Sequence, residues 1–244
     1  MLHRIVQPGW EMIQKYARMK FGEIEVACPY YMYTILRGLS ARVSIGKGFP
    51  EEIVEETNVL ALVNKVDLTK MSAEGIRSFM VTKSIGIDCS GYIAHVLHAV
   101  HGKRFFRSLT DDSFGAIFLR FRPFQKINVH LLRKSGTAID YRACEPEDVI
   151  VTRGGKHALL VIETKRDDNG TLKAIQYTHS TLYFKQNGVR FGSIEIVDQS
   201  KPLEQQRWIE GQAHMVESLQ EENYTYQGYV EDVAKNGVYR LSIE

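Results

Sequence analysis

The chain has 244 residues, of which 44% are hydrophobic and 25% are charged, enough to bury a core as one large domain or two small ones. Lysine and arginine number 31 against 29 acidic residues, and a net charge of +2 disfavours a nucleic-acid partner or a membrane surface. The three cysteines, Cys28, Cys89 and Cys144, form no CxxC pair. This spacing disfavours a zinc ribbon or a disulfide framework and fits a reducing compartment.

The N-terminal residues lack the continuous apolar stretch and the small-residue cleavage site of a secretion signal. No run approaches the ~18 consecutive apolar residues that predict a membrane-spanning helix. If Met1 is the natural start, we expect the protein in the cytoplasm. If a leader precedes it, the expected location is the cell wall or the exterior.

The first half of the chain predicts helices. An amphipathic helix is expected over residues 9–20, with Trp10, Ile13, Tyr16 and Ala17 on its apolar face. The aromatic segment "VACPYYMY" follows and is expected to be buried. Residues 50–64 begin with proline and acidic residues, as a helix start does, and a further helix is expected over 72–83 with Ser72 as its cap. The "IGKG" stretch lacks the spacing of a phosphate-binding loop, so nucleotide binding is disfavoured.

The second half of the chain predicts one more helix and then strands. The helix begins at Cys89 and ends at Gly102. The segments "DVIVTR", "HALLVIET", "LKAIQYTH" and "VRFGSIEIVD" are rich in β-formers, and "RDDNGT" between the second and third predicts a hairpin. Residues 201–224 are expected to form a helix, and "GVYRLSIE" a closing strand. The expected fold is α+β, with the Cys89 helix packed on an antiparallel sheet.

Cys89 stands where a thiol is readily made reactive. The start of a helix offers unpaired N–H groups and the positive end of the helix dipole, and both favour a thiolate. Asp88 is the expected cap of this helix, and the small Ser90 and Gly91 allow a substrate backbone to approach. The position therefore predicts a thiol of lowered pKa.

Two histidines provide a base for this thiol and a group that orients the base. His157 begins the strand "HALLVIE", and His179 lies near the end of the next strand. If these strands form a hairpin, the start of one lies beside the end of the other, and the two imidazoles face each other. The sequence thus predicts a nucleophile, a general base and an orienting residue at one place.

An ordered set of motifs is similar to the NlpC-type cysteine peptidases, papain-like bacterial enzymes that cut peptidoglycan stem peptides in the cell wall. The matching stretches are "CPYYMY", "DCSGYIAHVL", "EPEDVIV", "KHALLVIE" and "YTHS". The resemblance implies that Cys89 is the nucleophile, His157 the general base and later the acid, and His179 the residue that orients His157. It also implies that Tyr30 reaches the active site.

The resemblance covers residues about 10–33 and 84–197. Its implied fold is a single papain-like domain over 1–244 with a helical insertion at about 34–83, where the family has only a short glycine-rich stretch. The family's Pro-Gly-Asp turn is replaced by Pro146-Glu147-Asp148. We expect Asp88 and Ser90, which flank the nucleophile, to line the substrate site with Tyr30.

Other histidines and cysteines have simpler expected roles. His95, His98 and His101 are three residues apart, a spacing that can bind metal, but a zinc site needs three or four supported ligands. We therefore expect them to serve in packing or at the surface. Cys28 and Cys144 are expected to be buried structural residues.

The first hypothesis is a cysteine hydrolase that cleaves an amide bond in peptides or peptidoglycan fragments, of the γ-D-glutamyl–diamino-acid type, through a thioacyl enzyme. No metal or organic cofactor is implied, and no oligomeric state is indicated. A second hypothesis keeps the site but transfers the acyl group or acts on a lipid amide or ester. A third is an inactive binding module of the same fold, which slow labelling of Cys89 by iodoacetamide near pH 6 would favour.

Overall fold

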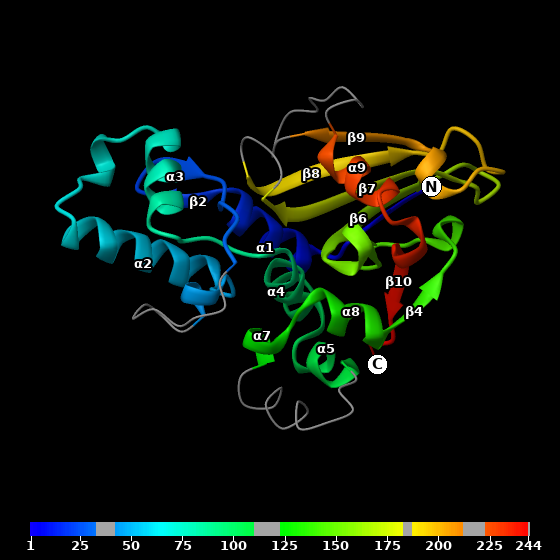
Figure 1. Cartoon of the computed structure of the whole chain (residues 1–244), viewed down its shortest axis with the longest axis horizontal. Coiled ribbons are helices and arrows are strands. Elements are labelled where there is room, and N and C mark those ends of the chain that lie inside the picture. Colours follow the sequence, from blue (N-terminus) through cyan, green and yellow to red (C-terminus); the bar gives the residue numbers. More distant parts are fainter. Residues whose placement is uncertain (33–41, 110–122, 183–186, 212–222, 244) are drawn as a thin grey trace.

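The computed structural model describes residues 1–32, 42–109, 123–182, 187–211 and 223–243. These residues form an α+β fold in which helices pack on an antiparallel sheet, as predicted (Figure 1). The described helices are α1 (Gln7–Ala17), α2 (Pro50–Val63), α3 (Ala73–Thr82), α4 (Cys89–His101), α5 (Lys103–Ser108), α7 (Pro123–Lys126), α8 (Val129–Ser135) and α9 (Tyr224–Val230).

The described part of the sheet has eight strands in the order β4-β10-β5-β6-β7-β8-β9, and β1 pairs with the C-terminal part of β6. Their bounds are β1 (Leu2–Arg4), β4 (Gly136–Ile139), β5 (Val149–Thr152), β6 (His157–Arg166), β7 (Leu172–Thr181), β8 (Gly188–Glu195), β9 (Arg207–Gly211) and β10 (Gly237–Leu241). The strands β2 (Met19–Phe21) and β3 (Ile24–Val26) form a separate hairpin.

The predicted meander is confirmed, because β5, β6, β7 and β8 pair in sequence and antiparallel. Its central turn uses the chemistry expected of "RDDNGT". The Asp167 carboxylate accepts the backbone N–H groups of Asn169 and Thr171 at 3.0 and 2.9 Å. Gly170 takes a φ of 78°, which glycine adopts without strain. This turn sets the register that places His179 near the start of β6.

The two faces of the sheet pack against different helices. On β6, side chains alternate between the faces, so that Ala158 and Leu160 join the core with α1 and α4, whereas Leu159 and Val161 join a second core with Trp208. The helix α9 packs over this second face, where its Tyr229 is buried. The Cys89 helix therefore packs on the sheet, as predicted.

The stretch expected to be a helical insertion carries helices where the structure describes it. The helices α2 and α3 lie with β2 at the end of the molecule remote from the main sheet (Figure 1). The hydroxyl of Ser72 caps α3 by accepting the N–H of Gly75 at 3.1 Å, as predicted. Part of the expected insertion, residues 34–41, lies outside the described residues.

Some sequence expectations are wrong. Trp10, expected on the buried face of the first helix, is 40% exposed, and Met32 of the aromatic segment is also exposed. The helix predicted for 201–224 is replaced in its first half by the strand β9, because residues 207–211 pair with β8 and bury Trp208. Residues 212–222 of this prediction lie outside the described residues. The closing strand is confirmed as β10.

Candidate active site

The helix α4 begins at Cys89, and its first turn is tightly capped. The carboxylate of Asp88 accepts the backbone N–H of Gly91 at 2.6 Å, which satisfies one of the free N–H groups at the helix start. The thiol of Cys89 is buried, and the nearby backbone N–H groups of Ala158 and Ser90 act to lower its pKa. Since Ala158 directly follows His157, the sulfur lies at the start of β6.

The two predicted histidines are in direct contact. The Nε2 atom of His157 and the Nδ1 atom of His179 are 2.7 Å apart, and both side chains are buried. The antiparallel pairing of β6 and β7 produces this contact, because the pairing of Leu160 with Thr178 places His179 diagonally across from His157. The prediction that the two imidazoles meet is confirmed.

The structure adds Glu210, which sequence analysis missed. Its Oε1 atom lies 2.8 Å from Nε2 of His179 and 3.3 Å from Nε of Arg190, and its side chain is fully buried. The Tyr177 hydroxyl donates to its other oxygen at 3.3 Å. Glu210 lies in β9, so the wrong helix prediction for 201–224 concealed it. Glu210 lies two residues after Trp208, and side chains two apart point to the same face of a strand. This spacing was the available signal for a strand here.

This chain of contacts fixes which nitrogen of each ring carries the proton. Glu210, paired with Arg190 as a carboxylate, only accepts, so His179 donates from Nε2 and its Nδ1 accepts when neutral. His157 must then donate from Nε2 to His179. The lone pair of neutral His157 is therefore on Nδ1, the nitrogen that can take a proton from a nucleophile.

The expectation of a lowered thiol pKa is wrong for this structure. Burial raises the pKa of Cys89 to about 12, and the charge of Asp88 acts in the same direction. Lys47 and the N–H groups of Ala158 and Ser90 oppose this rise, but burial outweighs them. Burial, His179 and Arg153 together hold the pKa of His157 well below its usual value. The resting site thus holds a neutral thiol and a neutral imidazole.

Asp88 and Ser90 belong to a buried polar cluster with Lys47. The Nζ atom of Lys47 lies 2.7 Å from both the Asp88 Oδ1 atom and the Ser90 Oγ atom, and all three residues are at most 5% exposed. The backbone N–H of Asp88 also donates to the carbonyl of Gly46 at 3.0 Å. These contacts fasten the segment around Lys47 to the start of α4. The predicted substrate contacts of Asp88 and Ser90 remain a prediction.

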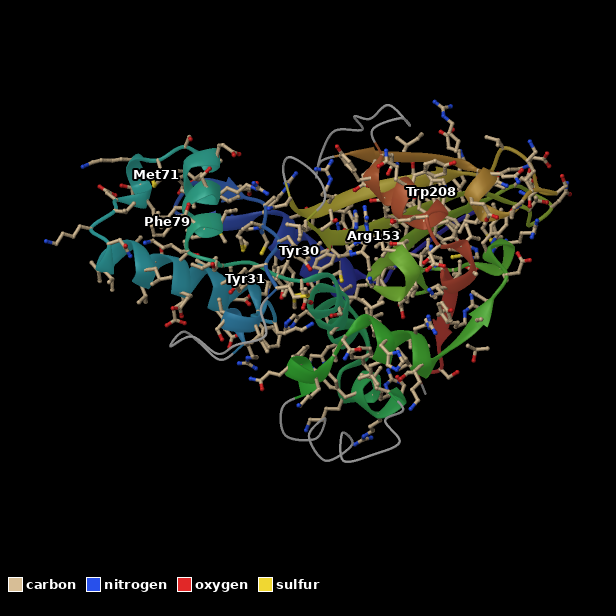
Figure 2. The ribbon with its side chains drawn as sticks, in the orientation of Figure 1. Tyr30, Tyr31, Met71, Phe79, Arg153 and Trp208 are labelled. Atoms are coloured by element: carbon tan, nitrogen blue, oxygen red, sulfur yellow. The ribbon has the colours of Figure 1, made fainter. Side chains whose placement is uncertain are left out.

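Tyr30 lies beside the site through its backbone. It forms a bridge with Ile87, two residues before the nucleophile, and its N–H donates to the side-chain oxygen of Asn187 at 3.4 Å. Its hydroxyl contacts the sulfur of Met32 at 3.6 Å, and Figure 2 shows Tyr30 near the middle of the molecule beside Tyr31. A direct role of the hydroxyl in the reaction remains a prediction.

The turn before β5 keeps the backbone that a glycine would adopt. Glu147 has a φ of 79°, in the left-handed region, at the position where the resembled family has glycine. Its carboxylate lies 2.5 Å from Nε2 of His101. Asp148 accepts the N–H of Glu145 at 2.8 Å and pairs with Arg240. Glutamate at position 147 is less favourable than glycine in this backbone conformation, and the side-chain contacts of Glu147 and Asp148 stabilise the turn.

His95 and His98 pack against aromatic rings, and Cys28 and Cys144 are buried, as predicted. His95 is fully buried, donates to the carbonyl of Lys47 from Nε2 at 3.0 Å, and stacks on Phe124 with the rings 4.1 Å apart. Cys28 and Cys144 are buried, and burial raises the pKa of each thiol. In the part of the chain that the structure describes, no group of three or more histidine, cysteine or acidic side chains could hold a metal ion.

Acid should destabilise the fold through its buried histidines. Burial lowers the pKa of His95 to about 3, whereas an unfolded histidine has a pKa of about 6.5. The resulting stability is complete above about pH 6.5 and is lost as the pH falls toward 3, because the unfolded state then binds more protons. We expect His95→Gln, which keeps a donor for Lys47, to reduce the pH slope of urea-measured stability by about 1.4 kcal/mol per pH unit. An unchanged slope would contradict this assignment.

No family model, curated protein or solved structure matches this chain. None of the described helices has the length and apolar character that a membrane crossing requires.

Proposed function

We propose that this protein is a cysteine hydrolase with a papain-like, NlpC-type domain that cleaves amide bonds through a thioacyl enzyme. One observation supports this most directly. A hydrogen-bonded chain of His157, His179 and Glu210 begins one residue before Ala158, whose backbone N–H acts to lower the pKa of Cys89. A nucleophile, a base and groups that orient the base are the components that acyl transfer requires.

The proposed reaction has two halves. As the sulfur attacks the amide carbonyl, Nδ1 of His157 takes the thiol proton, and backbone N–H groups at the start of α4 stabilise the oxyanion. The imidazolium then gives this proton to the leaving amine, and the C–N bond breaks. Water, deprotonated by His157, hydrolyses the thioester and restores the thiol. Glu210, acting through His179, stabilises the imidazolium in both halves.

The neutral resting pair changes the expected behaviour toward a thiol reagent. A preformed thiolate–imidazolium pair would give rapid alkylation near pH 6, but a thiol of raised pKa reacts slowly there. We expect iodoacetamide to label Cys89 slowly at pH 6 and faster with rising pH, as followed by peptide mass spectrometry. A pH-independent, rapid rate between pH 5 and 7 would contradict the neutral pair. Slow labelling therefore does not by itself favour a binding module.

The proposed substrate is a peptide or peptidoglycan fragment, with the γ-D-glutamyl–diamino-acid bond as the target implied by the motifs. Transfer of the acyl group to an amine or alcohol, or action on a lipid amide or ester, would use the same site. The sequence "DCSG" followed by the two strand histidines supports the peptide substrate. The long stretch between Tyr30 and Asp88 replaces a short one in the resembled family, so the surface that binds the substrate differs from that of the family.

The decisive test separates these substrates by mass. The protein is incubated with purified muropeptides and, separately, with acyl lipids; released products and the intact protein are then weighed at short times. A Cys89 acyl adduct and a cut muropeptide support the peptide hydrolase, whereas an adduct from lipids alone supports the lipid enzyme. If neither substrate set gives an adduct or a product, the binding module is favoured and the hydrolase is rejected.

A further inference from the structure

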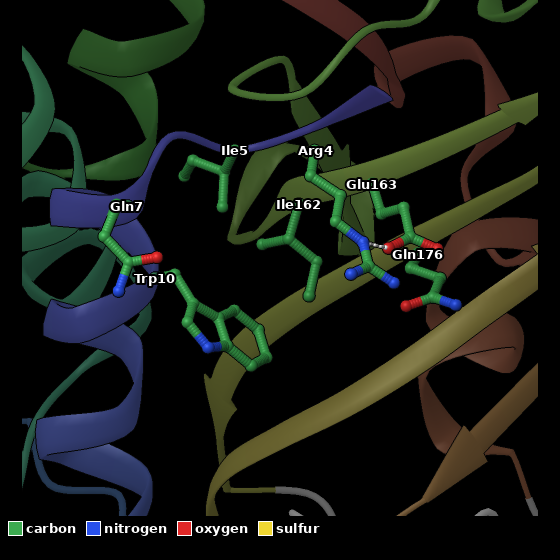
Figure 3. Close-up of a pocket in the computed structure, with 7 residues that line it drawn as sticks. All are labelled: Arg4, Ile5, Gln7, Trp10, Ile162, Glu163 and Gln176. Atoms are coloured by element: carbon green, nitrogen blue, oxygen red, sulfur yellow. Dashed lines mark hydrogen bonds and ion pairs between the residues drawn. The ribbon is translucent and has the colours of Figure 1, made fainter. Parts of the chain in front are cut away.

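A pocket of about 300 Å³ lies between β1, the start of α1 and the strands β6 and β7. Figure 3 shows the indole of Trp10 on one side of it and the ion pair of Arg4 and Glu163 on the other, with Ile162 between them. We call this hollow the Trp10 pocket. It lies about 20 Å along β6 from His157, given a rise of ~3.3 Å for each of the six intervening steps.

A β-bulge builds one wall of the Trp10 pocket. Successive side chains of a regular strand point to opposite faces, yet Ile162 and Glu163 both line this pocket. The register of β6 against β7 shifts between Val161 and Glu163, which allows both residues to do so. Gln176 pairs with Glu163 across the strands and adds an amide to the same wall. The local irregularity thus brings an apolar and a polar side chain to one hollow.

The opposite wall of the Trp10 pocket is the indole of Trp10, which is only partly buried. Trp10 is 40% exposed, whereas Ile13 and Tyr16 on the same helix are buried. Its ring touches Phe191 at a tilted angle of 56°, with the centroids 6.3 Å apart. Ile5 and Ile162, at 6% and 4% exposure, complete an apolar surface beside the indole.

The polar side chains of the Trp10 pocket on β1, β6 and β7 end in planar groups, and their charges sum to zero. Glu163 is 8% exposed and its carboxylate is paired with the guanidinium of Arg4. Because these charges neutralise each other, a charged ligand would gain no net attraction. The pair can still donate and accept hydrogen bonds in two directions, as can the amide of Gln176. A neutral ligand with several hydroxyl groups fits this wall.

We propose that the Trp10 pocket binds one neutral sugar ring of a saccharide. The C–H face of a pyranose packs on the indole, while hydroxyls along its edge bond to Glu163, Arg4 and Gln176. A volume of about 300 Å³ is at the lower end for ligand pockets and suits a single ring. The inference does not depend on the chemistry of Cys89, so either proposal can fail alone.

Tryptophan fluorescence tests the proposal directly, because the other tryptophan, Trp208, is fully buried. Full-length Cys89→Ala protein, which cannot turn over a substrate, is titrated with D-glucose, N-acetyl-D-glucosamine and their methyl glycosides. We expect a saturable emission change with a dissociation constant on the order of 1–10 mM for at least one sugar. Cyclohexanol and adenosine are the comparison compounds. No saturable change up to 100 mM of any sugar, or saturation by a comparison compound alone, would overturn the proposal.

Three variants locate the binding by saturation-transfer NMR, which does not need the Trp10 signal. Trp10→Ala should abolish transfer to the sugar, and Glu163→Gln should weaken binding about tenfold because a bidentate acceptor is lost. Tyr224→Ala removes another exposed aromatic ring, 44% exposed on α9, and should leave binding unchanged. Thermal melts check that each variant is folded. Undiminished transfer in folded Trp10→Ala would refute the assignment.

Discussion

Cys89→Ala is expected to abolish cleavage of the substrate found by the mass assay, with a loss of at least about a thousandfold in kcat. The expected loss is large because this thiol alone lies at the start of α4 beside the first residues of β6. Without it neither the attack nor the thioester can occur, and the hydrogen-bonded histidines have nothing to deprotonate. Initial rates of product release, read by mass, provide the measurement.

The matched control is Cys144→Ala, which removes another buried thiol from the second core. We expect this variant to keep its activity and to lose about as much stability as Cys89→Ala, near 1 kcal/mol in urea unfolding, since each change removes one buried sulfur. Glu210→Gln should lower kcat with little effect on KM, because its charge stabilises the imidazolium only during the reaction. Full activity in folded Cys89→Ala would eliminate the thiol mechanism.

Lys47→Met is expected to cost about 3–5 kcal/mol of unfolding free energy, because it leaves the carboxylate of Asp88 buried without its cation. The two groups are 2.7 Å apart and their side chains are each 6% exposed. Urea unfolding monitored by circular dichroism gives the free energy. The same variant should raise the pKa of Cys89 further, since Lys47 is the charge that lowers it.

An exposed ion pair provides the comparison. Lys15 and Glu51 are also 2.7 Å apart, but their side chains are 53% and 63% exposed, so Lys15→Met should cost less than about 1 kcal/mol. The double variant Lys47→Met with Asp88→Asn should recover much of the loss, because asparagine still caps the helix and carries no charge. Equal losses at Lys47 and Lys15, or strict additivity in the double variant, would contradict a coupled buried pair.

Local signals in the sequence predicted much of the fold. Asp88 before Cys89 marked the start of α4, and the Asn169-Gly170 turn defined the hairpin of β6 and β7. The contact of His157 with His179 followed from that hairpin. The strand β9 escaped prediction because residues 207–211 lie within a stretch rich in helix-forming residues, and pairing with β8 overrides that preference.

The site was harder to predict than the fold, because its energetics depend on contacts distant in sequence. Lys47 lies in the "IGKG" stretch, which lacks the spacing of a phosphate-binding loop and predicts no other role. Its pairing with Asp88 arises from tertiary packing. A helix start favours a thiolate, but the buried surroundings of Cys89 reverse the sign of the pKa shift. The exposure of Trp10 likewise depends on a pocket formed by three other elements. Burial and long-range pairing were the missing information in each case.

The strand β10 lies between β4 and β5 and hydrogen-bonds to both. It is also among the last described segments to leave the ribosome, so β5 has an open edge on the nascent chain until residues 237–241 arrive. An open edge of this kind pairs readily with other chains. Until residues 237–241 have been synthesised, this edge of β5 can pair with other chains, and a chaperone that shields β-rich edges would assist folding over that interval.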